Sequence, residues 1–354
     1  MSDFEPLFTI GIPTFNRVSF LRTSLAAAFA QQCESLEIIV SDNGSDDGTE
    51  EFCRGINDPR FRYVRSEVNH GPSWNFGRCL ELARGRFFSW LQDDDLIFPD
   101  FARRAAKSLE STHSDCYLAT AIYTAAPSFV YGDGLYSPPL TLDWGSEDVV
   151  EVPFSLMAPL SLCVSVAIPP VVAFRTKFLR AISSWFLEKN TVLYAERLLL
   201  VAAAQSGRVV AAPHVAGMFR QHPGQFSATT MSDRAETEDQ WNKFTEHLQA
   251  MVGCCDLDFS TFQNYAGTLP DNHLRIFISS LNGGGVPRQF SDSVLGVLTS
   301  EASSRWPNNT DETASANVSK TVANLVKHAI IQIMPPIALA ALRSAKRRWF
   351  TTTR

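Results

Sequence analysis

The sequence predicts an α/β protein, with a mostly parallel sheet flanked by helices and a mainly helical C-terminal extension. The first hundred residues alternate short apolar runs with amphipathic helical patterns, as βαβ units do. Beyond Ser227, helical segments joined by polar linkers replace this alternation. We therefore expect one domain over residues 1–230 and the extension over residues 231–354.

The composition limits the class of protein. The 354 residues carry a formal net charge of −6, which argues against a general nucleic-acid binder. The seven cysteines are scattered and form no CxxC pair, which favours free thiols in a reducing compartment. The N-terminus has no signal-peptide pattern, and no apolar run reaches the roughly 18 residues of a membrane-spanning helix. These features predict a cytoplasmic protein.

The expected elements follow from apolar periodicity and turn residues. Strands are predicted at 7–12, 36–40, 61–64, 87–91, 171–174 and 209–212, and helices at 18–32, near 49–52, at 73–83 and at 194–205. Pro13 is expected to end the first strand, because proline cannot donate to the ladder. Residues 117–170 are rich in proline, aromatic and small residues, and are predicted to form a loop-rich, substrate-facing region.

Polar turns follow three of the predicted strands, after Ile12, Val40 and Leu91. Ligands of open parallel α/β sheets bind at the carboxyl ends of the strands, so these turns are expected to gather along one functional edge. The sequence contains neither GxGxxG after the first strand nor GxxxxGK[ST], which excludes a dinucleotide fold or a P-loop.

The run Asp93-Asp94-Asp95 is the strongest chemical feature of the chain. Adjacent carboxylates repel one another, and a divalent cation offsets this repulsion. Mg²⁺ and Mn²⁺ commonly bind one or two carboxylates together with substrate phosphates. The alternative is a solvated acidic turn before a helix that begins near Asp100. The position of the run after a buried strand favours the metal site.

Asp42 and Asn43 end the second predicted strand. A carboxylate and an amide at this place suit the edge of a base or a ribose hydroxyl. An ordinary Asx turn before a helix explains the same residues. Thr14 and Asn16, after the first strand, have the same two interpretations.

Four blocks in order resemble family 2 glycosyltransferases. They are Thr9 to Arg17, Val40 to Thr49, the group Asn69-His70-Gly71 with Asn75-Phe76-Gly77 and Ala83-Arg84-Gly85, and Leu91 to Asp95 with Pro99 following. Weaker similarity continues at Tyr194-Ala195-Glu196 and at Phe219 to Gly224 with Ser227. The resemblance covers residues 7 to about 227.

The resemblance implies a GT-A type fold and transfer of a sugar from a nucleotide diphosphate-sugar to a glycan or glycolipid acceptor, with inversion. It divides the catalytic domain into a nucleotide-sugar part (7–115) and an acceptor part (116–230). The residues implied to bind the donor are Pro13, Thr14, Phe15, Asn16, Asp42, Asn43, Asn69, Asn75 and Asp93. Asp94, with Asp93 or Asp95, is implied to hold Mn²⁺ or Mg²⁺, and Glu196 to act as the catalytic base.

Two departures from the family pattern bear on the site. Gln92 stands where many relatives have the first aspartate of DxD, and Trp74 stands where an arginine is frequent. His222 is a further candidate ligand of the metal or the diphosphate, although a packed histidine is an equal alternative. A surface glutamate in a helix is the alternative explanation of Glu196.

Two other functions remain open. A sugar nucleotidyltransferase shares the α/β layout, but it normally has a Gly-rich basic loop after the first strand, where this chain has Pro13 to Asn16. A non-catalytic glycan-binding relative fits Gln92 and the single acid Glu196.

The C-terminal tail has a pattern of its own. Spacing of apolar residues predicts an amphipathic helix over 322–333, and a basic cluster lies over 343–348 beside Trp349-Phe350. Basic and aromatic residues together suit an anionic bilayer surface, and peripheral contact with the inner face of the membrane is one interpretation. A packed helix with a solvated basic end is the other.

Overall fold

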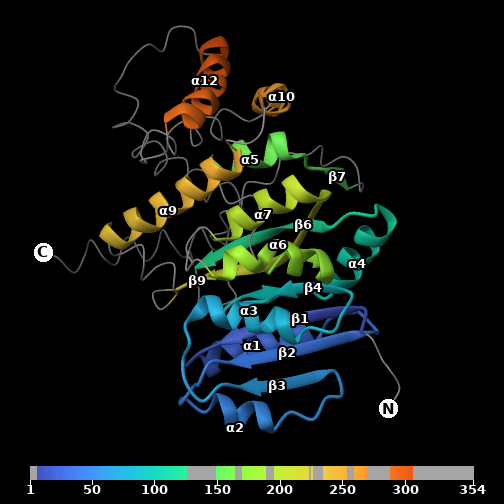
Figure 1. Ribbon diagram of the computed structural model, residues 1–354. Helices are drawn as coiled ribbons and strands as arrows, with labels where there is room; N and C mark the ends of the chain where they lie inside the picture. The colour runs from blue at the N-terminus through green and yellow to red at the C-terminus, as the bar shows by residue number, and fades with distance from the viewer. Residues whose placement is uncertain are drawn as a thin grey trace, which may run out of the picture.

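The computed structural model describes residues 6–125, 149–163, 170–188, 195–222, 225, 234–252, 259–268 and 288–305. Within them the chain forms one sheet of nine strands, in the order β3-β2-β1-β4-β8-β6-β9-β5, with β7 paired to β9 (Figure 1). The strands are β1 (Phe8–Thr14), β2 (Leu36–Asp42), β3 (Phe61–Arg65), β4 (Phe87–Trp90), β5 (Leu96–Ile97), β6 (Cys116–Ala125), β7 (Val150–Glu151), β8 (Val172–Arg175) and β9 (Val209–Gln221).

Helices cover both faces of this sheet. They are α1 (Val18–Phe29), α2 (Thr49–Arg54), α3 (Pro72–Leu82), α4 (Phe101–Ser111), α5 (Phe154–Cys163), α6 (Thr176–Glu188), α7 (Ala195–Ser206), α9 (Arg234–Val252), α10 (Ser260–Thr268) and α12 (Arg288–Arg305). One apolar core joins α1, α2 and α4 to the sheet, and a second joins α3, α5, α6 and α7 to its other face. The predicted α/β class is confirmed.

The sheet is mixed, and its parallel part is the half that the sequence indicated most clearly. Strands β3, β2, β1 and β4 pair in parallel. Strand β8 pairs antiparallel with β4 and β6, and β9 pairs antiparallel with β5 and β7 but parallel with β6. The polar turns after β1, β2 and β4 therefore do lie at one edge of the sheet.

Strand β1 continues through Pro13 to Thr14, two residues beyond the predicted end. The amide of Asn43 donates to the Thr14 carbonyl at 3.0 Å, so Thr14 faces β2. Its neighbour Pro13 therefore faces β4, whose pairing with β1 ends at Gly11. The missing N–H of Pro13 costs no ladder bond there, and the strand carries Thr14 into the site.

Helix α3 packs very closely on β1. A side chain added at Gly11 would place its Cβ 2.8 Å from the Cβ of Cys79 and 3.0 Å from the ring of Phe88. Only a glycine leaves room for this approach, which holds the start of the site-bearing turn against the sheet.

The prediction of a loop-rich region over 117–170 is wrong for two of its parts. Strand β6 lies between β8 and β9, and α5 is a buried helix. Helix α5 contains Pro159 and buries residues on all sides, so it lacks the one-sided apolar pattern that identifies an amphipathic helix. Strand β9 is also longer than the predicted 209–212, and its extension carries Arg220 toward the aspartate run.

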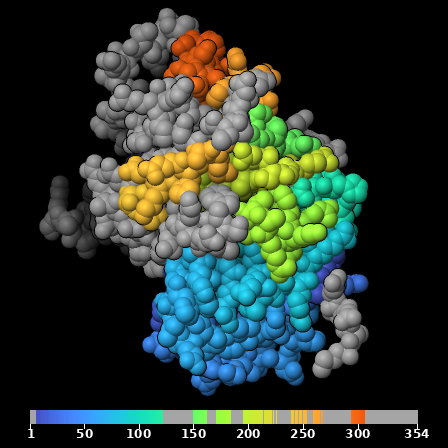
Figure 2. Space-filling view, in the orientation of Figure 1, coloured from blue at the N-terminus to red at the C-terminus, as the bar shows by residue number. Residues whose placement is uncertain are grey.

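The C-terminal helices pack on the rest of the chain. Helix α9 contacts α7, and α10 contacts α5 and α12. Phe244 and Leu248 of α9 are buried in the same core as α7, and the space-filling view shows the surfaces of the two helices in contact (Figure 2). The boundary near residue 230 stays a prediction, and the tail predictions over 322–350 lie outside the described residues. Among the described helices, none has the length and apolarity that crossing a membrane requires.

Candidate functional site

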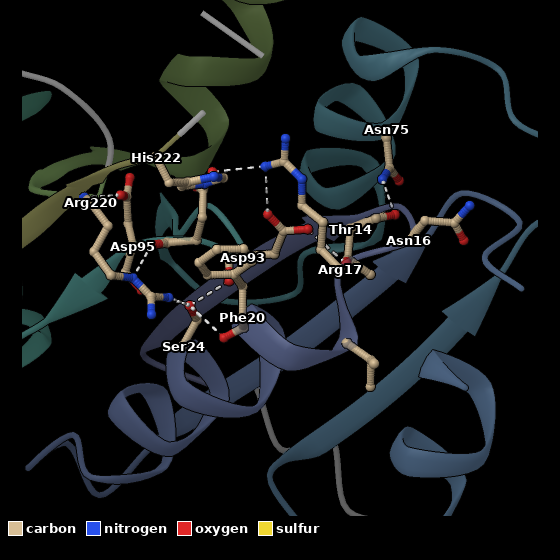
Figure 3. Close-up of polar contacts among 12 residues, drawn as sticks. Thr14, Asn16, Arg17, Phe20, Ser24, Asn75, Asp93, Asp95, Arg220 and His222 are labelled. Carbon is tan, nitrogen blue, oxygen red and sulfur yellow. Dashed lines mark hydrogen bonds and ion pairs between the residues drawn. The ribbon is translucent and has the colours of Figure 1, made fainter. Parts of the chain in front are cut away.

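The ends of β1, β4 and β9 bring polar side chains from three distant parts of the chain together (Figure 3). Thr14 ends β1 and Arg17 precedes α1; Asp93 to Asp95 follow β4; Arg220 lies near the end of β9. All three aspartates are buried, with at most 5% of their surface exposed. The predicted aspartate run is therefore no solvated acidic turn.

Asp93 is held from the side of β1. Its Oδ2 accepts a hydrogen bond from the Thr14 hydroxyl at 2.7 Å, and its Oδ1 lies 3.4 Å from Arg17 Nη1. Burial raises the pKa of Asp93 to about 7, the neighbouring Asp94 carboxylate adds to this rise, and Arg17 and Thr14 oppose it.

Asp94 is the meeting point of two basic side chains. Its Oδ2 accepts a hydrogen bond from Arg17 Nη1 at 2.7 Å and lies 3.0 Å from His222 Nε2. The His222 ring stacks on Phe20 of α1, with ring centroids 4.3 Å apart. The structure thus brings the predicted residues Asp94 and His222 together across 128 residues of sequence.

Asp95 points toward the strand β9 backbone. Its Oδ1 accepts a hydrogen bond from the Arg220 amide at 2.9 Å, and its own amide donates to the Gln92 carbonyl at 3.1 Å. Burial, followed by the Asp94 carboxylate, raises the pKa of Asp95 well above its usual range. These contacts fix the turn, while Asp94 and His222 face each other; the predicted metal role of Asp95 stays a prediction.

Ser24 and Arg220 hold the main chain of the aspartate run. The Ser24 hydroxyl lies 2.7 Å from the carbonyl oxygens of both Asp93 and Asp95. The Arg220 guanidinium donates to the Asp94 carbonyl and, at 3.2 Å, to Ser24 Oγ. Arg17 and Arg220 lie in blocks of the family resemblance, but the sequence assigned no role to either of them or to Ser24, since their contacts are with residues far away in the chain.

Asn75 joins the ends of two strands. Its side-chain amide donates to the Thr14 carbonyl at 3.2 Å and to the Ser41 carbonyl at 3.0 Å, and its Oδ1 accepts from the Ser41 hydroxyl at 2.6 Å. The residue is 3% exposed. Every polar atom of this side chain is thereby engaged in holding β1 beside β2.

Asn43 and Asn69 form a second polar link. Asn43 donates to the Asn69 side chain at 2.7 Å and to the Gly71 carbonyl at 3.0 Å, and accepts from the His70 amide at 3.0 Å. These bonds order the chain that leads into α3.

Asp42 is fully buried at the end of β2. It accepts hydrogen bonds from the Tyr63 hydroxyl at 2.5 Å and from the Ser45 amide at 2.9 Å. The second of these is the Asx-type turn that the sequence offered as the alternative to ligand binding. A donor role for Asp42 stays a prediction.

The rim of this edge is formed by other predicted residues. Phe15 is 40% exposed and Asn69 is exposed, whereas Pro13 is buried. Asn16, at a φ of 53°, has an exposed side chain whose Oδ1 accepts from the Asp46 amide at 2.8 Å. Phe15 and Asn16 are thus exposed at this edge, and their contact with the donor stays a prediction.

Glu196 is far from the aspartate run in the sequence and belongs to a different secondary-structure element. It stands in the first turn of α7, a helix whose neighbours include α5, α6 and α9. Its role as a base stays a prediction.

The block Ala83-Arg84-Gly85 of the family resemblance holds strands together. The buried Glu37 accepts hydrogen bonds from Thr9 Oγ1 at 2.8 Å and from Arg84 Nε at 2.7 Å. The Gly85 amide donates to the same Thr9 hydroxyl at 2.8 Å. This network ties the loop before β4 to β1 and β2.

The side chains at this site suit a divalent cation that is coordinated partly by the protein and partly by a bound substrate. Asp94 Oδ2 and His222 Nε2 converge, and a carboxylate oxygen with an imidazole nitrogen suits Mn²⁺. In the part of the chain that the structure describes, no group of three or more His, Cys, Asp or Glu side chains could hold a metal alone. Asp94 and His222 therefore fit a cation whose remaining coordination positions are filled by substrate phosphates and water.

Comparison with known proteins decides the family of the N-terminal part. Residues 9–143 match the model described as glycosyl transferase family 2. These residues belong to that family. The resemblance on which the sequence prediction rested is therefore confirmed for the family 2 segment.

Curated relatives match about a quarter to a third of this chain. The succinoglycan biosynthesis protein ExoO of Rhizobium meliloti is 31% identical over 102 residues, covering 29% of this chain and 29% of that protein. A GalNAc(5)-diNAcBac-PP-undecaprenol beta-1,3-glucosyltransferase of Campylobacter jejuni is 34% identical over 93 residues, covering 25% of this chain and 30% of that protein. The matches thus span less than a third of either relative.

The fold is similar well beyond the family 2 segment. The crystal structure of S. aureus TarS 1-349 in complex with UDP-GlcNAc matches with a TM-score of 0.57 and 16% identity, covering 86% of this chain and 93% of that one. The GT-A type fold that the sequence predicted is confirmed.

Proposed function

We propose that the chain is a glycosyltransferase that moves a sugar from a nucleotide diphosphate-sugar to an acceptor hydroxyl. The observation that carries this proposal is the contact between Asp94 and His222 at the carboxyl edge of β4, with Asp93 joined to Asp94 through Arg17; both aspartates lie in the family 2 segment. Buried carboxylates and an imidazole at that edge suit a diphosphate bound through a cation.

The proposed reaction is a single displacement with inversion. The acceptor oxygen forms a bond to the anomeric carbon while the bond from that carbon to the diphosphate oxygen breaks. The leaving nucleotide diphosphate keeps the electron pair, and the acceptor proton passes to a carboxylate base, for which Glu196 is the candidate. Inversion follows because attack and departure occur on opposite faces of the sugar carbon.

Asp94 and His222 would hold Mn²⁺ or Mg²⁺, with Asp93 beside them. The bound cation would neutralise charge that develops on the leaving diphosphate. Thr14 orients Asp93, Ser24 and Arg220 fix the main chain, and Asn75 keeps the β1 and β2 turns at their spacing. Phe15, Asn16 and Asn43 would contribute to the nucleoside side.

The relatives support the class of pathway. One is named for succinoglycan biosynthesis and another for transfer to an undecaprenol-linked glycan. We propose that this chain acts in bacterial-type surface polysaccharide or glycolipid synthesis, on the cytoplasmic side of the membrane. Contact with the membrane through residues 336–354 belongs to this proposal, and liposome flotation of the full chain and of a chain ending at 335 tests it.

Donor turnover tests the proposed reaction. The full chain is incubated with a panel of nucleotide-sugars and Mn²⁺, and free nucleoside diphosphate is measured. We expect release from one donor, loss of release with a chelator, and at least a hundredfold loss in Asp94→Asn, since removing one charge-stabilising group costs about that much. Release of pyrophosphate from a sugar phosphate and a nucleoside triphosphate would instead identify a nucleotidyltransferase.

Glu196→Gln separates donor binding from transfer. We expect this variant to bind the nucleoside diphosphate with unchanged affinity and to lose transfer to the acceptor. Glu51→Gln is a matched control, because Glu51 lies in the first turn of another helix and is exposed. Equal transfer by the Glu196→Gln variant and the wild type would remove Glu196 from the mechanism. Nuclear magnetic resonance of the first-formed product tests inversion.

A further inference from the structure

Arg17 occupies the carboxylate edge on which the proposed cation site depends. Its Nη1 lies 2.7 Å from Asp94 Oδ2 and 3.4 Å from Asp93 Oδ1, so one nitrogen bridges two carboxylates. Both carboxylates are almost completely buried, whereas the Arg17 side chain is 25% exposed. The Arg17 guanidinium therefore lies closer to the surface than the two carboxylates, and part of it is exposed to solvent.

The oxygen that Arg17 binds is also the oxygen nearest His222. Asp94 Oδ2 receives Arg17 Nη1 on one side and has His222 Nε2 at 3.0 Å on the other. A guanidinium cannot be deprotonated in a protein, so it stays a cation at any working pH. A divalent cation coordinated by this oxygen would add two positive charges beside it. Arg17 and the cation thus compete for Asp94.

The position of Arg17 in the fold limits which positions its side chain can reach. It is the residue before α1, and its backbone carbonyl accepts the amides of Phe20 and Leu21 at 3.0 and 2.9 Å. The backbone is anchored, so exchange is restricted to the long side chain. A guanidinium that leaves Asp94 stays beside the same edge, where its planar fork matches two phosphate oxygens.

We propose that Arg17 is an exchangeable counter-ion: its single positive charge pairs with Asp94 and Asp93 in the empty enzyme, and the side chain moves to the donor diphosphate when the cation binds Asp94. This inference rests on the proposed function and adds to it a residue that contacts the leaving group. It predicts opposite effects of removing Arg17, because the side chain opposes cation binding but supports diphosphate binding.

Two binding measurements test the exchange, and neither depends on turnover. Free Mn²⁺ is followed by electron paramagnetic resonance during titration of the donor-free chain. The affinity for a nucleoside diphosphate is then measured by calorimetry at saturating Mn²⁺. For Arg17→Met we expect Mn²⁺ to bind about tenfold more tightly and the diphosphate about tenfold more weakly, each near 1.4 kcal/mol.

Two further variants make the test specific. Arg17→Lys keeps the charge without the fork, so it should bind Mn²⁺ like the wild type and the diphosphate with intermediate affinity. Arg22→Met is the matched control: Arg22 lies in the second turn of α1, the helix that Arg17 precedes, is exposed and stacks on Phe52 at 4.1 Å. It should change neither affinity.

The outcomes distinguish the inference from the function on which it rests. Weaker binding of both Mn²⁺ and diphosphate in Arg17→Met would show that Arg17 only builds the site, and unchanged binding would show that it does nothing there; both overturn the exchange. A wild-type chain that binds neither Mn²⁺ nor any nucleoside diphosphate would overturn the proposed function itself. If Arg17→Met does not fold, the Arg17→Lys result decides, since equal diphosphate affinity in Arg17→Lys and wild type would contradict a role for the fork.

Discussion

At the scale of single residues, the site depends on side chains that hold backbone in place. The polar atoms of the Asn75 side chain contact Thr14 and Ser41, and its predicted contact with the donor stays a prediction. Removing such a buried amide lowers stability mainly because the groups that it had hydrogen-bonded lose their partner. Asn75 therefore links the ends of β1 and β2, whatever contact it makes with a ligand.

Asn75→Ala tests this structural role. The change removes the hydrogen bonds that Asn75 makes to two carbonyls and one hydroxyl, and the Thr14 carbonyl keeps a second one, from the Asn43 amide. We therefore expect a loss of about 2–3 kcal/mol in the free energy of unfolding. Urea unfolding followed by fluorescence measures it. Asn57→Ala, at an exposed asparagine, should stay within about 0.5 kcal/mol of the wild type. A loss in Asn75→Ala no larger than that of the control would contradict the structural link.

At the scale of elements, the contact between α3 and β1 limits how the first turn can move. Gly11 allows α3 to approach the strand that ends in Thr14. The nearest obstacle to a larger residue is a Cβ atom, which cannot rotate away. The spacing between these two elements is therefore fixed by backbone.

Gly11→Ala should destabilise the protein by about 1–3 kcal/mol, because overpacking a tight contact forces backbone shifts. Cys79→Ala should not restore stability in the double variant, since alanine keeps the Cβ that lies in the way. Gly55→Ala serves as the control: its nearest neighbours are 3.5 Å away and its φ of −77° suits alanine. Thermal unfolding of the four proteins measures these effects, and full rescue by Cys79→Ala would contradict this account of the contact.

Strand β9 also carries a histidine that makes stability depend on pH. Burial lowers the pKa of His214, Arg104 lowers it further, and Asp100 opposes them. The ring lies 3.2 Å from the Tyr117 hydroxyl of β6. The folded chain thus binds the His214 proton less readily than the unfolded chain does.

The contribution of His214 to the free energy of unfolding is fully present above the pKa of histidine in the unfolded chain, about 6.5. It is lost as the pH falls below that value toward the lower pKa of His214 in the folded chain. Replacement by asparagine should flatten this part of the profile. The free energy of unfolding in urea between about pH 5 and 7.5 provides the measurement, with exposed His113→Asn as control. The same slope in His214→Asn and wild type would show that another group causes the dependence.

At the scale of the whole molecule, the C-terminal helices share the main core. Phe244 and Leu248 of α9, Phe262 of α10 and Leu298 of α12 are buried with α5 and α7. The extension therefore completes the face of the sheet that carries α3, α6 and α7. We expect the described helices and the sheet to unfold together.

Phe244→Ala should lower the free energy of unfolding by about 3–5 kcal/mol, as loss of a buried phenyl ring does. The unfolding transition should shift as one event when it is followed by calorimetry. A separate early transition, with the main one unchanged, would instead indicate an independent C-terminal domain.

The sequence predicted the parallel part of the sheet and the family because both depend on local patterns. Apolar runs and turn residues place β1, β2 and β4 within two residues of their ends. Helix α5 was missed because it is buried on all sides and contains Pro159. Arg17 and Ser24 were missed because their contacts join residues 76 or 77 and 69 or 71 positions apart, which no local pattern reveals.

The link from Ser24 to Arg220 spans 196 residues and has a consequence for biosynthesis. The ribosome synthesises the three aspartates well before β9, so these carboxylates stay without Arg220 and His222 while residues 96–219 are being added. Contacts between such distant residues form late, because closing the long loop costs entropy before it gains any contact. The family 2 segment can therefore fold first as a sheet and helices, and its reactive edge is assembled only when the last strand docks.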